Sequence, residues 1–333
     1  MSTSWPLALI CVTYRSGTLL ADFAPRALAA VRACGGLVVV VDSGSCDDTP
    51  RRAHELMPAA DVLQLDSNRG FAAGINAGID HVRALGGADA YVVANPDVLL
   101  EPLTLVRLLR APRPRPAIAV PRLSDRGSVL PSLRRVPSMA TTWADALLGG
   151  PMAARLGLPT ELIREPGRYS ADGAVGWATG GLMLIDAACA DAVGPWDESF
   201  FLYDEEVDYA LRAADLGYPV WYVHEAHATR LGGADAPAPW AEALMKRNRV
   251  HTLELRHGGL FTATAAAGLI VGSVMRAAAR RPEARAALWA LVTSASPAEI
   301  RARYGPSPLP ERPQSRSVSV TFSRLGPPDA VET

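Results

Sequence analysis

Four short apolar segments in the first hundred residues constrain the fold of this chain more than any other feature. They lie at 7–13, 37–41, 62–65 and 91–94 and are rich in Val, Leu, Ile and Ala. The first is typical of a strand buried on both faces, the second and fourth are expected to be buried strands, and the third is expected to be a further strand. The segments between them carry apolar residues at helical spacing, over about 18–31, 48–57 and 71–84. This alternation predicts an α/β fold with a doubly wound, mostly parallel sheet.

Polar turns follow the second, third and fourth of these expected strands, at 42–45, 66–70 and 95–97. In the last of them Pro96 cannot donate a hydrogen bond, so strand pairing must stop there. The carboxyl ends of parallel strands share one sheet edge, which is where ligands bind in open α/β sheets. We therefore expect a polar site along this edge, with the Asp97 carboxylate at its lip.

The middle of the chain is less regular. Its prolines at 112–116 interrupt a helix that begins near Leu103, and 120–123 is predicted to be a short edge strand. Residues 124–172 are expected to be mostly loop, and their arginines are either solvated or in contact with phosphates or an acceptor. Regular secondary structure is expected again after residue 172. The predicted elements are a glycine-interrupted strand over 175–185, helices over 187–193 and 207–216, and a strand over 220–223.

An acidic run stands before and within the helix at 207–216. It contains Asp204, Glu205, Glu206 and Asp208. A solvated helix N-terminus would favour such residues, but the apolar residues 200–203 suggest that the run emerges from the core into a cleft. There, repulsion and desolvation would raise some of the carboxyl pKa values, and one carboxylate can act as a general base.

Together, Asp97 and the acidic run provide the minimum apparatus for transferring a glycosyl, nucleotidyl or phosphoryl group. A divalent cation at Asp97 can neutralise a diphosphate, and a carboxylate across the cleft can deprotonate a hydroxyl. Inverting glycosyl transfer, nucleotidyl transfer and phosphoryl transfer all fit this pattern. The sequence lacks the GxxxxGK[ST] loop of P-loop kinases, and its first strand-to-helix turn, at 13–17, lacks the GxGxxG of dinucleotide enzymes.

The net charge and the composition indicate which partners and which cellular compartment to expect. The net charge of −1 argues against nucleic acid as a partner. No secretory signal pattern is evident and the four cysteines show no CxxC spacing, so we expect a cytoplasmic protein. At the C-terminal end, a basic amphipathic helix at 240–257 precedes the small apolar residues 259–275, which form either a packed helix pair or a peripheral contact with the inner membrane face. Residues 304–333, rich in Pro, Arg and Ser, are expected to be a disordered tail.

Several motifs, in this order and spacing, resemble those of the inverting family 2 glycosyltransferases of GT-A fold, most closely the rhamnosyltransferase-like branch. They are VTYRSG (12–17), VVVVDSGSCDDT (38–49), NRGFAAGINAGI (68–79), YVVANPDV (91–98), WATGGLMLI (177–185), VGPWDESFFLYDEEVDYALRAADLGY (193–218) and HATRLGG (227–233). The resemblance implies a GT-A domain at 1–235, with a nucleotide-binding half at about 1–110 and an acceptor half at 111–235, and a helical C-terminal appendage at 236–303.

The resemblance also implies an activity: a hexosyltransferase of cell-wall or polysaccharide biosynthesis. It would use a UDP- or dTDP-sugar, with dTDP-L-rhamnose favoured, and Mg²⁺ or Mn²⁺. The acceptor would be a glycan, either polyprenyl-linked or part of a small molecule.

Matching the motifs position by position implies roles for individual residues. Asp97 would be the metal ligand, and Glu206 would be the catalytic base, with Asp208, Glu205 or Asp204 able to share or take over that role. The acceptor wall would contain Trp177, Thr179 and Gly180. The nucleotide-sugar pocket would contain Thr13, Asp42, Gly44, Asn68, Gly70, Asn76 and Asn95.

Two departures from the family pattern leave alternatives open. Glu206 stands where relatives usually have Asp, and its extra methylene displaces the carboxylate. Arg230 stands where many relatives have His, and an arginine cannot be a metal ligand; His227 is a candidate substitute. A nucleotidyl- or phosphoryltransferase and a catalytically degenerate glycan-binding relative therefore remain as rival hypotheses.

Overall fold

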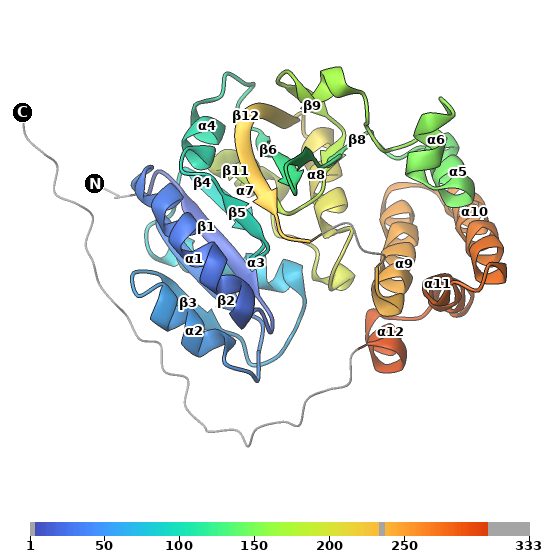
Figure 1. Ribbon diagram of the computed structural model, residues 1–333, viewed down its shortest axis with the longest axis horizontal. Coiled ribbons are helices and arrows are strands. Elements are labelled where there is room, and N and C mark those ends of the chain that lie inside the picture. The colour runs from blue at the N-terminus through green and yellow to red at the C-terminus, as the bar shows by residue number, and fades with distance from the viewer. Residues whose placement is uncertain (1–3, 233–236, 306–333) are drawn as a thin grey trace, which may run out of the picture.

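The computed structural model describes residues 4–232 and 237–305. Its central sheet has the order β3-β2-β1-β4-β11-β6-β12-β5, with β7 added to β6 and β9 added to β12 (Figure 1). The strands β3, β2, β1 and β4 are mutually parallel, β11 is antiparallel to both its neighbours, and β6 and β12 are parallel. The predicted α/β class with a mostly parallel sheet is confirmed.

The strands of this sheet are β1 (Ala8–Thr13), β2 (Leu37–Asp42), β3 (Asp61–Gln64), β4 (Ala90–Ala94), β5 (Val98–Leu100), β6 (Ile118–Asp125), β7 (Ser128–Val129), β9 (Gly173–Val175), β11 (Leu182–Asp186) and β12 (Val220–Arg230). A separate two-stranded sheet pairs β8 (Leu133–Arg134) with β10 (Trp177–Ala178). The helices that cover the large sheet are α1 (Gly17–Arg32), α2 (Thr49–Leu56), α3 (Phe71–Ala84), α4 (Thr104–Arg110), α7 (Ala187–Val193) and α8 (Glu205–Asp215).

Two apolar cores explain why the first strands are continuously hydrophobic. In β1, Ala8, Ile10 and Val12 point to the core shared with α3, α7 and α8. Leu9 and Cys11 point to the opposite core, shared with α1, α2 and α4. Because successive strand residues face opposite sides, both sets are buried only when helices cover both faces.

The second half of the chain differs from the prediction at several places. The segment 120–123 is not at an edge, since it belongs to β6, between β11 and β12. Pro121 fits there because β11 pairs only with Ile118 and Ala119, and β12 bulges at the position of the proline, between Val223 and His227. The predicted strand over 175–185 is divided into β9, β10 and β11, and the strand at 220–223 continues to Arg230 as β12.

The segment predicted to be mostly loop contains two helices, α5 (Met139–Leu148) and α6 (Gly150–Arg155), and two short 3₁₀ turns lie at Pro166–Tyr169 and Glu198–Phe200. The C-terminal helices are α9 (Pro239–Arg256), α10 (Gly259–Ala278), α11 (Pro282–Thr293) and α12 (Pro297–Tyr304), and α5 and α6 lie beside them (Figure 1). A side chain at Gly268 of α10 would come within 2.9 Å of the Trp143 ring of α5. Close packing of α10 against α5 therefore explains the glycine at position 268.

By length and composition α10 could also cross a membrane, with a mean hydropathy of 1.5 and one third of its apolar window (33%) buried. The boundary expected at residue 235 stays a prediction. The tail expected at 304–333 lies outside the described residues from 306 onward.

Candidate active site

A cleft of about 840 Å³ opens at the carboxyl ends of β1, β2 and β4. Its lining includes four of the seven residues predicted for the nucleotide-sugar pocket, together with Asp97: Thr13, Asn68, Gly70 and Asn95. The C-terminal helices also reach it, because Trp240 of α9 and Arg301 of α12 are part of the lining. The Arg301 guanidinium lies 4.0 Å from the centre of the Phe201 ring, which also lines the cleft.

Three other predicted pocket residues lie outside this lining. Asp42 is fully buried and accepts hydrogen bonds from the Thr13 hydroxyl at 3.1 Å and from the Ser45 backbone at 2.7 Å, so it supports Thr13. Gly44, at φ +68°, lies so close to the Ser67 backbone that a Cβ would be only 2.8 Å away. The Asn76 amide exchanges hydrogen bonds with the backbone of Trp196, both at 2.9 Å.

A strained turn leads from the cleft into the acidic run. Phe201, Tyr203 and Asp204 all have positive φ angles, of 65°, 69° and 69°, a conformation that costs non-glycine residues roughly 1–3 kcal/mol each. A side chain of helix α9 holds the turn from behind. The Asn248 amide nitrogen donates at 2.8–2.9 Å to three of its carbonyl oxygens, those of Phe200, Leu202 and Tyr203.

The same turn explains why residue 70 is glycine. The Phe71 amide donates to the Phe201 carbonyl at 2.7 Å, and a Cβ at Gly70 would come within 2.1 Å of that oxygen. Gly70 also has a φ of +99°, which side chains rarely adopt. The two loops that meet at this edge of the cleft are therefore packed backbone against backbone.

Glu206 is the most accessible carboxylate of the acidic run. Asp204, Glu205 and Asp208 are only 8%, 4% and 3% exposed, and Asp208 is paired with Arg212 at 2.8 Å, whereas Glu206 is partly exposed. Burial, followed by the charge of Asp204, raises the pKa of Glu206 to about 7. Burial also raises the pKa values of Asp204 and Glu205. Desolvation thus raises the pKa values of all three groups, and repulsion between neighbouring carboxylates adds to the rise at Glu205 and Glu206, as expected.

Gly180 packs directly against Glu206. A Cβ at Gly180 would lie 3.2 Å from that of Glu206, and the Gly180 backbone amide helps to stabilise the Glu206 carboxylate, opposing the rise of its pKa. The next residue, Gly181, accepts a backbone hydrogen bond from Asn95 at 3.0 Å. The chain thus connects Glu206 to the cleft-lining turn that carries Asp97.

Asp97 has one engaged oxygen and one free oxygen. Its Oδ2 pairs with Arg230 Nε at 3.1 Å, because β5 and β12 place residues 98 and 230 opposite each other. Its Oδ1 is buried and has no hydrogen-bond partner within the described part of the chain. A lone carboxylate oxygen at a cleft fits one bond to a divalent cation. The described residues contain no cluster of three or more metal-binding side chains, so most other ligands would come from a bound substrate or water. His227 lies beside Glu101, at 3.8 Å.

Trp177, predicted for the acceptor wall, is held in a buried ionic network. Its indole donates to Glu161 Oε2 at 3.2 Å, and the guanidinium groups of Arg134 and Arg249 lie 5.6 and 5.5 Å from the centre of its ring. The hydroxyl of Thr179 is buried without a hydrogen-bond partner among the residues described. Three of the six arginines of the 124–172 segment bind protein groups: Arg134 donates to the Pro131 carbonyl, Arg135 pairs with Glu165, and Arg168 donates to the Ala174 carbonyl.

Comparison with known proteins decides the family. The profile for glycosyl transferase family 2 matches residues 10–145. An N-acetylglucosaminyl-diphospho-decaprenol L-rhamnosyltransferase of Mycobacterium tuberculosis (strain CDC 1551 / Oshkosh) is 32% identical over 275 residues, which are 77% of this chain and 87% of the relative. The counterpart in strain ATCC 25618 / H37Rv gives the same values. The chain belongs to glycosyltransferase family 2. The predicted family and the predicted class of enzyme are both confirmed.

Solved structures support the fold of this family 2 glycosyltransferase. The mannosyltransferase PcManGT from Pyrobaculum calidifontis, in complex with GDP-Man and Mn²⁺, superimposes with a TM-score of 0.51 at 15% identity over 91% of this chain and 80% of its own. GalNAc-T7 with UDP, GalNAc and Mn²⁺ gives a TM-score of 0.55 at 13% identity over 76% of this chain and 48% of its own. Both of these neighbours were solved with Mn²⁺ bound. At such low identity they show the fold alone.

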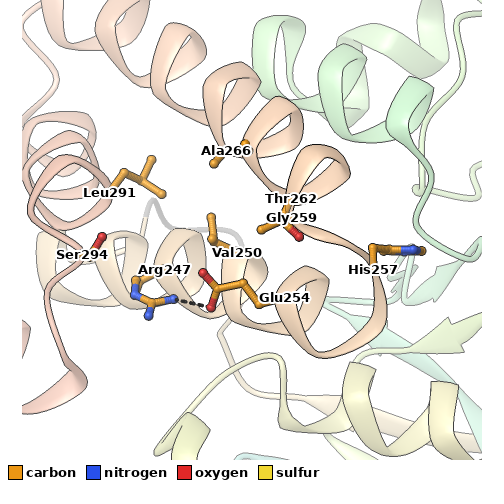
Figure 2. A pocket seen from close by; sticks show the side chains of 10 residues that line it. Arg247, Val250, Glu254, His257, Gly259, Thr262, Ala266, Leu291 and Ser294 are labelled. Atoms are coloured by element: carbon orange, nitrogen blue, oxygen red, sulfur yellow. Dashed lines mark ion pairs between the residues drawn. The ribbon is translucent and has the colours of Figure 1, made fainter.

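A second hollow of about 380 Å³ lies among α9, α10 and α11 of the glycosyltransferase (Figure 2). Arg247 and Glu254 face each other there at 3.7 Å, beside Val250 and Leu291. None of the residues predicted for the active site lines it. The motifs therefore point to the cleft at the strand ends.

Proposed function

We propose that this enzyme transfers L-rhamnose, with inversion, from dTDP-L-rhamnose to a hydroxyl of a polyprenyl-diphosphate-linked sugar. The observation that carries the reaction is the partly exposed Glu206 carboxylate, with a pKa of about 7, which packs against Gly180. Glu206 is not itself among the residues that line the cleft, but Gly181, the residue after Gly180, accepts a hydrogen bond from Asn95, which lines the cleft together with Asp97. The choice of donor and acceptor is supported by the rhamnosyltransferase relative, whose name specifies rhamnose and a decaprenyl-diphosphate-linked N-acetylglucosamine.

In the proposed mechanism, Glu206 accepts the proton of the acceptor hydroxyl as its oxygen attacks the anomeric carbon of the donor. The bond from that carbon to the diphosphate oxygen breaks, and the nucleoside diphosphate leaves with the bonding electron pair. Asp97, through its free oxygen, would hold Mg²⁺ or Mn²⁺ with help from Asn95, and the cation would neutralise charge on the diphosphate. Thr13, supported by Asp42, and Asn68 would bind the nucleotide.

A donor and acceptor screen tests this proposal. Purified protein with Mn²⁺ should transfer sugar from dTDP-L-rhamnose to a synthetic polyprenyl-diphosphate-linked N-acetylglucosamine, and transfer from UDP-N-acetylglucosamine and GDP-mannose should be at least roughly tenfold slower, since pocket contacts discriminate donors by kcat/KM. Mass spectrometry of the lipid product measures this. Faster transfer from another donor would correct the sugar, and failure to bind any nucleoside diphosphate would refute the enzymatic proposal.

We also propose that the cytoplasmic enzyme binds the inner membrane face peripherally through α10. Exposed apolar side chains follow one face of this helix at helical spacing, with Leu260 84%, Val271 43%, Val274 48% and Met275 55% exposed. Exposed Arg280 and Arg281 lie just beyond its end and would attract anionic lipids. A lipid-linked acceptor would be presented at such a surface.

Vesicle co-sedimentation tests this contact. Replacing Arg280 and Arg281 with glutamine should weaken binding to phosphatidylglycerol vesicles roughly fivefold for each charge removed, because a basic residue near an anionic surface is worth about 1 kcal/mol. V274S with M275S should weaken it further. Leu216→Ser, which removes an equally exposed apolar side chain (52%) after α8, is the matched control and should leave binding unchanged. Equal binding of all variants would exclude this surface.

A further inference from the structure

Arg249 of helix α9 stands between the acidic run and the acceptor wall. We propose that it is a positioning residue for glycosyl transfer: by bridging Asp204 and Glu161 it locks Glu206 and Trp177 into one geometry. The inference rests on the proposed function, because it assigns the base and the acceptor wall to those two residues. It adds a C-terminal helix to the catalytic apparatus.

The contacts form a continuous chain through buried groups. Arg249 Nε lies 3.3 Å from Asp204 Oδ2, and Arg249 Nη1 lies 3.3 Å from Glu161 Oε2. Glu161 Oε2 in turn accepts the indole N–H of Trp177 at 3.2 Å. At the other end Asp204, the N-cap residue of α8, immediately precedes Glu205 and Glu206. A displacement of Arg249 would therefore disturb both the acidic run, which contains Glu206, and the acceptor wall, which contains Trp177.

Helix α9 contacts the strained turn with two further side chains. Asn248 donates to the three carbonyl oxygens of residues 200, 202 and 203, and the Thr252 hydroxyl donates to Asp204 Oδ2 at 3.0 Å. Asn248 is 2% exposed and Thr252 is fully buried. Positive φ angles persist only where surrounding contacts fix them. Residues 248, 249 and 252 supply those contacts from a single helix.

Arg249 also compensates the negative charge of the buried carboxylates around it. Five carboxylates contribute negative charge around Arg249: Asp204, Glu205, Glu206, Glu161, and Asp145 of α5. The positive charges near them are those of Arg249, of Lys246 in the same helix, and of Arg134 beside Trp177. Burial raises the pKa values of both Asp204 and Glu161, and the charge of Arg249 opposes this rise. Removing one partner of a buried ionic network leaves the others uncompensated. Arg249 thus fixes charge as well as position.

The test compares Arg249→Met and Arg249→Lys with a control variant, Arg247→Met, in which the same change is made two residues away. In Arg249→Met, kcat with dTDP-L-rhamnose should fall by roughly 100-fold or more, since small displacements at a reaction centre cost that much, while the Kd of dTDP should stay within about threefold. The acid limb of the pH profile of kcat/KM should move to higher pH, because the charge that opposes the raised pKa of Glu206 is gone. Arg249→Lys should keep the pH midpoint. Arg247→Met, which faces the second hollow, should behave as wild type.

Hydrogen exchange supplies a readout that needs no turnover. Amides of the peptide 198–208 should exchange faster in Arg249→Met than in wild type and in Arg247→Met, because the turn is no longer held. If Arg249→Met does not fold, Thr252→Val removes one contact to Asp204 at nearly constant volume, and should give the same changes at smaller size. Unchanged exchange and unchanged kcat in the folded variant would overturn the inference. A wild-type protein that binds no nucleotide would refute the proposed function instead, and the exchange experiment would still decide whether Arg249 holds the turn.

Discussion

Glu206→Gln is expected to abolish most turnover while leaving donor binding intact. Glutamine keeps the shape of the side chain but cannot accept the proton of the acceptor hydroxyl, and loss of a general base typically costs 10²–10⁴-fold, so we expect a fall in kcat of about 10³-fold. The Kd of dTDP-L-rhamnose should change by less than about threefold, since this proton transfer occurs only after binding. Single-turnover kinetics and calorimetry measure the two quantities separately.

The pH dependence gives the same experiment a second readout. Glu206 must be ionised to act as a base, so kcat/KM of the wild type should rise with pH through about 7, the pKa to which burial and Asp204 raise this group. The effect of the same ionisation on folding stability has the opposite sign, since stability falls as the pH rises. A carboxyl whose pKa is raised on folding, here from 4.5 to about 7, stabilises the fold below pH 4.5 and loses that contribution as the pH rises through 7. Glu206→Gln should therefore gain stability relative to wild type between pH 5 and pH 8.

Asp208→Asn is the matched control for the base. Asp208 is buried and paired with Arg212 at 2.8 Å, so its substitution should lower stability with little change in kcat. If Asp208→Asn were inactive and Glu206→Gln active, the base would have to be reassigned to Asp208. Equal loss in both variants would indicate that the acidic run acts through its structure.

The first half of the fold could be predicted because its signals are local. The strands β2, β1 and β4 are mostly contiguous apolar segments, the edge strand β3 contains the apolar pair Val62 and Leu63, and the turns after β2, β3 and β4 are visible as small polar residues next to them. The position of Asn95 and Asp97 at a ligand-binding edge follows from the topology of parallel strands alone. The acidic run could be recognised for the same reason, since four carboxylates within five residues signal shifted pKa values wherever they are buried.

The remaining contacts could not be predicted because they join residues far apart in sequence. Asn248 meets Phe200 across 48 positions, and Arg230 meets Asp97 across 133. The burial of Trp177 beside Arg249 depends on how α9 returns to the sheet, for which its basic amphipathic pattern gives no direction. Likewise, Pro121 suggested an edge strand, and only the bulge in β12 makes a central position acceptable.

The ion pair between Asp97 and Arg230 changes what is expected of the metal site. Arg230 occupies one of the two oxygens that a cation would use, so metal binding by Asp97 should rest on its free Oδ1 and be weaker than that of a free carboxylate. The positive charge of Arg230 nevertheless lies beside Asp97, which lines the cleft proposed to bind the donor. A histidine at this position could be a metal ligand, whereas Arg230 can supply only a charge.

Asp97→Asn is therefore expected to remove the metal dependence of donor binding. In the wild type, Mn²⁺ should tighten binding of dTDP. In Asp97→Asn that increase should disappear and kcat/KM should fall by roughly 10²–10³-fold, because one electrostatic partner of the leaving diphosphate is lost. Calorimetry of dTDP with and without Mn²⁺ measures the first effect.

Arg230 provides the control that separates metal binding from simple charge. Arg230→Gln frees the second Asp97 oxygen, so Mn²⁺ should bind about tenfold more tightly, within the range by which groups around a metal ligand change affinity. The same variant should bind dTDP more weakly when Mn²⁺ is absent, because a cation beside the cleft has been removed. Arg230→Lys keeps that charge and should restore the metal-free affinity. If Mn²⁺ affected dTDP binding equally in wild type and Asp97→Asn, the cation would have to bind elsewhere, and Asp97 would serve mainly as the partner that orients Arg230 toward the diphosphate.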